Sequence, residues 1–334
     1  MGVPSVVISA RGSECVFDKF ILTVRSVINI IVEGTYFQAK EDNKMELNYE
    51  IQGNGSPIVM IHTGGADSRV WKYMAPTLAQ SFKVITFDGR GTGGSPALLE
   101  PTSLVEDLHK LLEHLGLDRI TLVGHSMGGQ VATDFTLLYP SMVERLVVIA
   151  PSLTGFTFSS EFTEYMATVN AAAPDITKLV ELALAGPIYR ASMASPHRDF
   201  LHELYTHYMT RVFTEWKSFE VLWPEPPAIE RLEQIAASTM FIQGTIEWSD
   251  MNKIAEHFKR VPVIRFAEIK GADHMLVLTH AEELANLIRQ FVQGEHNDAT
   301  NPGRERSYSH SRQRKHSYCC NGDFYRERVP CRCH

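Results

Sequence analysis

Cysteine is scarce through most of this sequence. Of the five cysteines among 334 residues, only Cys15 lies outside the last sixteen positions. A secreted domain stabilised by disulfides would distribute an even number of cysteines through its core. The scarcity therefore favours a reducing compartment, and we expect a cytoplasmic protein. The clustered cysteines match no zinc-binding spacing, so no metal site is expected there; they are Cys319, Cys320, Cys331 and Cys333.

Long apolar runs are also missing. The best stretch, residues 20–32, is interrupted by Arg25 and Asn29 and is too short to span a bilayer. The sequence does not open with the basic start and apolar run that are typical of a signal peptide. We therefore expect no stable membrane span.

Basic charge is in deficit. The chain has 32 Lys and Arg residues against 39 Asp and Glu residues, a net charge of −7. A nucleic-acid-binding protein needs a basic footprint, so we expect no nucleic-acid partner. The stretch 303–334 departs from this average, with eight basic and three acidic residues and few apolar ones. We interpret residues 294–334 as a disordered basic tail.

Between these ends, predicted strands alternate with predicted helices. A continuous apolar run, typical of a strand buried on both faces, lies at 57–61, and further strands are predicted at 83–87, 120–123, 145–149 and 239–243. Helical patterns separate them, and in one of these Ser103 and Glu106 have the spacing of a capping box. This alternation of strands and helices predicts an α/β fold with a mostly parallel sheet flanked by helices.

The strand pattern stops after Pro151 and resumes near residue 236. The stretch between is helical in pattern and rich in aromatic residues and methionine. We therefore divide the chain into an N-terminal extension with a first hairpin strand at 35–39 (1–44), a first core part (45–150), a helical lid (151–235), a second core part (236–293) and the tail (294–334).

The sequence Gly124-His-Ser-Met-Gly-Gly129 lies between a predicted strand and a predicted helix that begins at Gln130. This is the setting of a nucleophile elbow, a tight turn that exposes a serine above the sheet edge. Bulky side chains two positions from the serine would collide with the backbone, and Gly124 and Gly128 avoid this. The motif predicts Ser126 as a nucleophile.

Three further segments follow the order of a known family. They are His62-Thr-Gly-Gly65, Asp88-Gly-Arg-Gly-Thr-Gly-Gly-Ser95 and Gly271-Ala-Asp-His274. With the elbow, they resemble the α/β-hydrolase superfamily, in particular its serine esterase-like, lid-bearing branch. The sequence departs from the family pattern at Thr63 and at Asp273, where Gly is usual. The resemblance spans roughly residues 45–292 and implies an α/β-hydrolase fold with an inserted lid.

A serine hydroxyl needs a base, and the base needs a carboxylate to orient it. The resemblance implies that His274 is the base and that the acid lies three residues after Gly244, at Glu247. Asp250 is the alternative acid, although it could instead cap the helix that follows. The order Ser126, Glu247, His274 is the one expected for this fold.

The remaining site residues are predicted from their neighbourhood. The oxyanion of an acyl-transfer reaction needs two preorganised donors, for which we expect the amides of Met127 and Gly64, with Gly65 in reserve. An apolar substrate pocket is expected under the lid. Its predicted wall residues are Trp71, His125, Tyr165, Trp223 and Trp248.

Two other chemistries fit the sequence poorly. His202 and His207 are separated by five positions and so diverge around a helix, which argues against a metal site. The glycines of 89–94 are followed by Pro96 rather than by a helix, which argues against a dinucleotide site. No cofactor and no metal are expected.

We therefore expect a serine hydrolase that cleaves a carboxylic ester, a lactone or a thioester of an apolar small molecule. Two alternatives stay open. The same triad could hydrolyse a carbon–carbon bond of a diketone, or the fold could serve as a ligand receptor with little turnover. The sequence does not indicate the substrate or the oligomeric state.

Overall fold

The computed structural model describes residues 45–294. The predicted strand at 35–39, the N-terminal extension and the basic tail from 295 onward lie outside the described residues. Seven strands form one sheet in the order β1-β3-β2-β4-β5-β6-β7. Their bounds are Tyr49–Gln52 (β1), Pro57–Ile61 (β2), Lys83–Phe87 (β3), Ile120–His125 (β4), Val143–Ile149 (β5), Ser238–Ile246 (β6) and Ile264–Asp273 (β7).

Only the β1–β3 pair is antiparallel, and the other five pairs are parallel. The central strand β4 is buried along its whole length, whereas the edge strands β1 and β7 are partly exposed. Burial on both faces explains why the central strands are mostly apolar. The structure confirms an α/β fold with a mostly parallel sheet.

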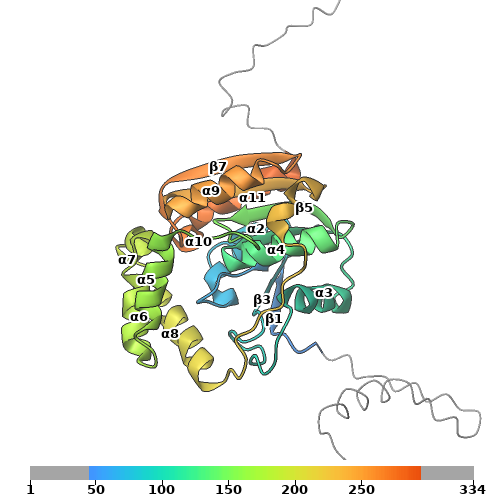
Figure 1. Cartoon of the computed structure of the whole chain (residues 1–334). Helices are drawn as coiled ribbons and strands as arrows, with labels where there is room; N and C mark the ends of the chain where they lie inside the picture. The colour runs from blue at the N-terminus through green and yellow to red at the C-terminus, as the bar shows by residue number, and fades with distance from the viewer. Residues whose placement is uncertain (1–44, 295–334) are drawn as a thin grey trace, which may run out of the picture.

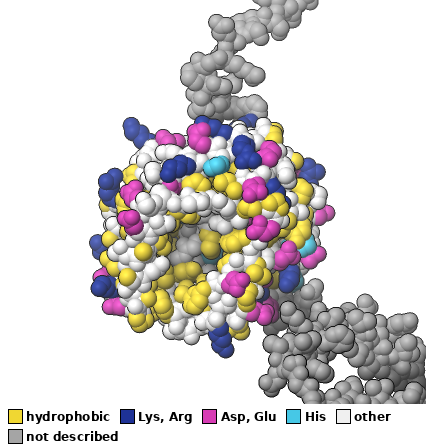
Figure 2. All heavy atoms as spheres, in the orientation of Figure 1, with side chains coloured by type: hydrophobic (Ala, Val, Ile, Leu, Met, Phe, Trp, Pro, Cys, Tyr) yellow, Lys and Arg dark blue, Asp and Glu magenta, His cyan; other side chains and the backbone are white. Residues whose placement is uncertain are grey.

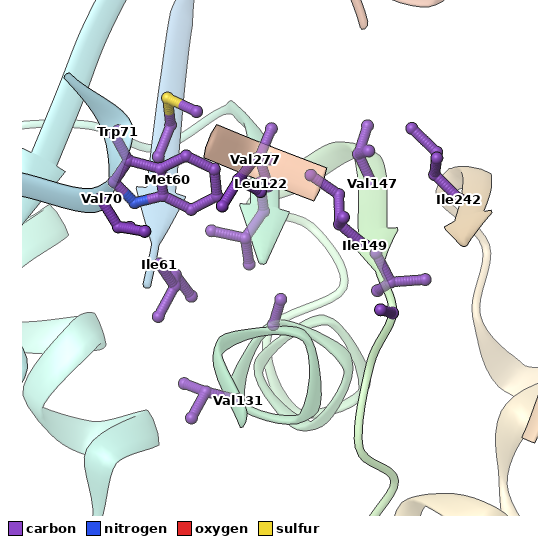
Figure 3. Packing of buried hydrophobic residues seen from close by; sticks show 14 of the residues in the cluster. Met60, Ile61, Val70, Trp71, Leu122, Val131, Val147, Ile149, Ile242 and Val277 are labelled. Carbon is purple, nitrogen blue, oxygen red and sulfur yellow. The ribbon is translucent and has the colours of Figure 1, made fainter. Parts of the chain in front are cut away.

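Helices flank this sheet (Figure 1). Those of the core are η1 (Ser68–Trp71), α2 (Ala75–Leu78), α3 (Leu104–His114), α4 (Met127–Leu138), α9 (Ser249–Phe258), α10 (Leu276–Thr279) and α11 (Ala281–Gln293). Helix α3 packs on α4, and α2 packs on α11. Figure 3 shows strand residues such as Met60, Leu122 and Val147 packing with Trp71 and Val277 in the core.

Helix ends follow local chemistry. The Ser103 hydroxyl accepts a hydrogen bond from the Glu106 amide at 3.2 Å, which confirms the predicted start of α3. Helix α4 begins at Met127, three residues before the predicted Gln130. Gly128 lies within α4, and a larger residue would not fit because α4 runs close to β2: a Cβ there would lie 2.3 Å from the Ile61 carbonyl oxygen. This glycine permits close packing and does not end a helix.

Residues 151–235 lie between β5 and β6, and we call them the insertion. Its elements are α5 (Ser160–Asn170), α6 (Ile176–Leu184), η2 (Pro187–Tyr189), α7 (Arg190–Met193), α8 (Arg198–Thr214), η3 (Ala228–Glu230) and η4 (Leu232–Gln234). Helix α6 packs on both α5 and α8, and α7 packs on β7 and α10. Figure 1 shows α5 to α8 gathered beside the sheet.

None of the helices in residues 45–294 combines the length and the apolarity needed to cross a bilayer.

Candidate active site

Ser126 lies at the sharp turn between β4 and α4. Its backbone φ is 55° and its ψ is −116°, a conformation that side-chain-bearing residues rarely adopt. Gly124 allows the turn, because a Cβ at this position would lie 2.2 Å from the carbonyl oxygen of Gly128. The predicted strained strand–turn–helix geometry is confirmed.

A chain of hydrogen bonds connects Ser126 to His274 and Glu247. The Ser126 Oγ lies 3.0 Å from His274 Nε2. On the other side of the ring, His274 Nδ1 lies 3.1 Å from both carboxylate oxygens of Glu247. Because an ionised carboxylate only accepts, Nδ1 carries the proton and Nε2 is free to accept the serine proton. The loops after β4, β6 and β7 bring these three side chains together.

Burial and charge oppose each other at His274. Its side chain is 12% exposed and that of Glu247 is 5% exposed. Burial lowers the pKa of His274, but the charge and hydrogen bond of Glu247, together with the charge of Asp273, raise it above its ordinary value. The site therefore favours an imidazole that can accept a proton and hold the resulting charge.

Asp250, the alternative acid, has a different role. Its carboxylate accepts hydrogen bonds from the amide and hydroxyl of Ser159, at 3.0 and 2.7 Å, and pairs with Lys253 at 2.9 Å. Helix α9 has Trp248 at its N-cap and no side-chain cap, so the expectation that Asp250 caps it is wrong. Asp250 instead ties the start of α5 to the core.

The predicted oxyanion loop lies next to the nucleophile. Gly64, Gly65 and Met127 line the same cavity as Ser126. A Cβ on Gly64 would lie 3.8 Å from the Met127 side chain, so the two residues are neighbours. Gly65 has a φ of +77°, and a Cβ there would lie 2.8 Å from the Tyr205 ring. The insertion thus packs directly on this loop.

His62 holds the loop in place, a role that the sequence did not indicate. Its Nδ1 donates to the Thr63 carbonyl at 2.7 Å, and its Nε2 accepts from the Gly89 amide at 3.0 Å. Burial lowers the pKa of His62, which is consistent with a neutral ring that accepts at Nε2. The motif around Asp88 is thereby connected to the loop around Gly64.

A cavity of about 300 Å³ opens at Ser126. The insertion supplies most of its apolar wall: Phe158, Phe162, Tyr165, Met166, Val169, Ile188, Tyr189, Tyr205, Tyr208 and Met209. The core adds Trp248, Met251 and Ile254. Figure 2 shows a hollow on this face of the molecule with hydrophobic side chains around it. Tyr165 and Trp248 therefore lie where the sequence analysis placed them.

Three other predicted pocket residues do not line this cavity. Trp71 is fully buried in the core, and its ring meets that of His125 edge-on at 6.4 Å between centroids. His125 is also fully buried, and its Nε2 donates to the carbonyl oxygen of His274 at 2.8 Å. Trp223 is half-buried against the core away from the cavity. Aromatic composition alone did not show which way these side chains point.

No group of three or more His, Cys, Asp or Glu side chains within residues 45–294 is arranged to hold a metal ion.

Comparison with known proteins places this geometry in a family. The family model described as "alpha/beta hydrolase fold" matches residues 56–281. The chain is 33% identical over 120 residues to a soluble epoxide hydrolase of Corynebacterium sp. (strain C12), a match covering 35% of the chain and 42% of that enzyme. The first curated relatives are thus matched over less than two thirds of their length.

Two further comparisons cover more of the chain. The human (lyso)-N-acylphosphatidylethanolamine lipase is 25% identical over 302 residues, which is 80% of this chain and 85% of that protein. A thermophilic esterase from Thermogutta terrifontis superposes with a TM-score of 0.60 at 22% identity, over 74% of this chain and 93% of that one, which shows the shared fold. With its sheet, its elbow and the family-model match over most of its described length, this chain belongs to the α/β-hydrolase fold family.

Proposed function

We propose that this chain is a serine hydrolase that cleaves a carboxylic ester, lactone or thioester of a neutral, apolar small molecule. The observation that carries the proposal is the continuous hydrogen-bond chain from Ser126 through His274 to Glu247, at 3.0 and 3.1 Å. Family membership supports a hydrolase. The names of the human lipase and the Thermogutta esterase agree with acyl-ester chemistry.

The proposed reaction has two halves. Ser126 attacks the acyl carbon while His274 Nε2 takes its proton, and Glu247 stabilises the imidazolium that forms. The amides of Met127 and Gly64 stabilise the oxyanion, and each such donor typically lowers the barrier by about 3 kcal/mol. His274 then protonates the departing alcohol. Water enters and attacks the acyl-enzyme while His274 removes its proton, and His274 then returns this proton to Ser126 Oγ as the acid is released.

The cavity lining supports a neutral substrate. Within residues 45–294, no lysine or arginine lines the cavity, so these residues offer no counter-ion to a carboxylate or phosphate group. Burial raises the pKa of Tyr165 and raises that of Tyr208 to about 12, so these phenols are neutral. Aromatic and methionine side chains form most of the remaining wall. The insertion would act as the lid over this cavity, because it supplies the wall that faces the core.

Covalent labelling tests the proposal. A fluorophosphonate probe should modify the wild-type protein at Ser126 and leave Ser126→Ala unmodified. A panel of neutral esters, lactones and thioesters, with a diketone and a carboxylate-bearing ester for comparison, should then show turnover of neutral acyl substrates. Diketone cleavage without ester turnover would transfer the proposal to carbon–carbon hydrolysis. A protein that neither labels nor turns over any member would contradict a hydrolase function.

A further inference from the structure

The backbone on each side of His274 is tied to the insertion. The His274 amide donates to the carbonyl of Ile188 at 3.0 Å. The next residue of the insertion, Tyr189, places its ring edge-on to the imidazole, with 6.3 Å between centroids. Helix α7, which follows immediately, packs on β7 at the point where β7 ends before His274. The insertion therefore contacts the base from outside the core.

Asp273 makes the strongest of these connections. Its carboxylate is fully buried and accepts from Ser192 of α7 twice, from the amide at 2.6 Å and from the hydroxyl at 2.6 Å. It also accepts from the amide of Met275 at 3.1 Å. Ser192 is itself fully buried. Asp273, which precedes His274, thus bonds to Met275, which follows it, and its carboxylate is bonded in turn to Ser192 of the insertion.

None of these three donors is charged. They satisfy the Asp273 oxygens without cancelling the negative charge, which acts on the adjacent imidazole. The other groups facing His274 are Glu247, which is negative, and two neutral ones. Burial raises the pKa of Tyr189 far above its ordinary value and keeps it a phenol. Burial lowers the pKa of His125 well below its ordinary value, so that ring is uncharged at neutral pH.

We propose that Ser192 and Asp273 are a positioning pair, through which the insertion holds His274 in register with Ser126, and that Asp273 is a second carboxylate supporting the imidazolium beside Glu247. The proposal rests on the proposed hydrolase function. It assigns a role to Asp273, at a position where the motif it resembles usually has Gly. It also makes the insertion a part of the catalytic geometry as well as a wall of the cavity.

Variants of Ser192 and of Asp273 have different consequences: the first changes only the position of His274, whereas the second also removes a negative charge. Ser192→Ala removes one hydrogen bond and keeps the Asp273 charge. We expect kcat to fall about 10- to 100-fold, as small misplacements of reacting groups do, with KM little changed. The acidic limb of the kcat/KM profile should stay at its wild-type pH, because the charge beside His274 is unaltered.

Asp273→Asn removes the charge as well. Loss of a nearby negative charge lowers the pKa of His274, so the acidic limb should move to lower pH while kcat falls at least as far as in Ser192→Ala. Asp273→Ser serves as the second neutral variant should the amide prevent folding. The pH dependence of fluorophosphonate labelling gives the same limb without a substrate.

The matched control is Asp134→Asn. Asp134 is also a fully buried core carboxylate that accepts from an insertion hydroxyl, that of Thr154, and Thr154 does not adjoin His274. In this variant, kcat and the pH of the acidic limb of the kcat/KM profile should both stay at their wild-type values. Neutral Asp273 variants with a wild-type limb, or a Ser192→Ala variant with a wild-type rate, would overturn the proposal. Failure of the hydrolase function itself would look different, because the wild type and the control would then neither label nor turn over.

Discussion

The core and the insertion contribute to one cavity in different ways. The core supplies Ser126, His274 and Glu247 from loops at the ends of three parallel strands, so their spacing follows from the sheet. The insertion supplies side chains from the faces of several short helices, whose packing on one another sets where each ring points. In the proposed function, the core would therefore supply the chemistry and the insertion the shape of the cavity. The following experiments separate the two contributions.

The largest effect is expected in the core. Ser126→Ala should lower ester turnover by about 10⁴-fold or more, because the attacking oxygen is removed. Binding of an apolar product to the cavity should be unchanged, since the insertion wall is intact. Steady-state kinetics measures the loss of turnover, and calorimetry measures product binding. Turnover near the wild-type level would remove Ser126 from the mechanism.

The acid should come next. Glu247→Gln should lower kcat by roughly 10⁴-fold, because the amide favours the wrong imidazole tautomer. The charge of Glu247 raises the pKa of His274. Without this charge, the acidic limb of the kcat/KM profile should move to lower pH. Asp250→Asn is the control, and its kcat should stay within a few-fold of wild type because Asp250 contacts Ser159 and not His274. If Asp250→Asn lost activity and Glu247→Gln did not, Asp250 would be the acid of the triad instead of Glu247.

A third experiment addresses the boundary between the regions. Burial raises the pKa of Asp134, on α4, to about 6, above the ordinary value of an aspartate. The folded state therefore holds this proton more tightly than the unfolded state, and stability falls as pH rises through this window. At 1.4 kcal/mol per pH unit the loss approaches about 3 kcal/mol. Asp134→Asn lacks this loss, so urea unfolding should show its stability relative to wild type increasing between pH 4 and pH 7. If the difference in stability between the variant and wild type stayed constant across that range, Asp134 would have the ordinary pKa of an aspartate.

The smallest effect is expected in the insertion. Tyr165 lines the cavity, and its hydroxyl is held by the carbonyls of Leu182 and Ala183 at 2.9 and 2.7 Å. Tyr165→Ala should enlarge the cavity and change the ratio of kcat/KM between long and short acyl esters about tenfold. Phe219→Ala, at a side chain that is 67% exposed, should leave the ratio unchanged. Equal ratios in both variants would show that this wall does not select the acyl group.

Sequence reasoning was more successful for the core than for the insertion. The elbow is a local pattern of strand, turn and helix, so Ser126 could be located from six residues. His274 and Glu247, in loops that follow strands, were located by the resemblance to the family. The structure brings all three side chains within hydrogen-bonding distance, although their catalytic roles stay predictions. Backbone strain and strand ends can be recognised within a short window of sequence.

Contacts between distant segments could not be predicted in this way. The expected cap at Asp250 is wrong because its partner, Ser159, lies 91 positions earlier in the insertion. Trp71 and His125 were assigned to the pocket by residue type, yet they pack on each other beneath it. Only the three-dimensional packing of helices determines whether an aromatic ring faces the cavity or the core.

The chain enters and leaves the insertion between two strands that pair directly, with Arg145 of β5 opposite Ser238 of β6. A protein engineer could therefore exchange the whole insertion for another helical segment without altering the order of the sheet. The exchange has requirements, because Ile188, Ser159 and Thr154 of the insertion also bond to groups of the core. A replacement that lacks a hydroxyl and an amide donor at the position of Ser192 would leave Asp273 with the Met275 amide but without its two insertion donors, at a cost of about 1–3 kcal/mol. A new substrate pocket grafted here should therefore keep the Ser192 contact together with these other contacts to the core.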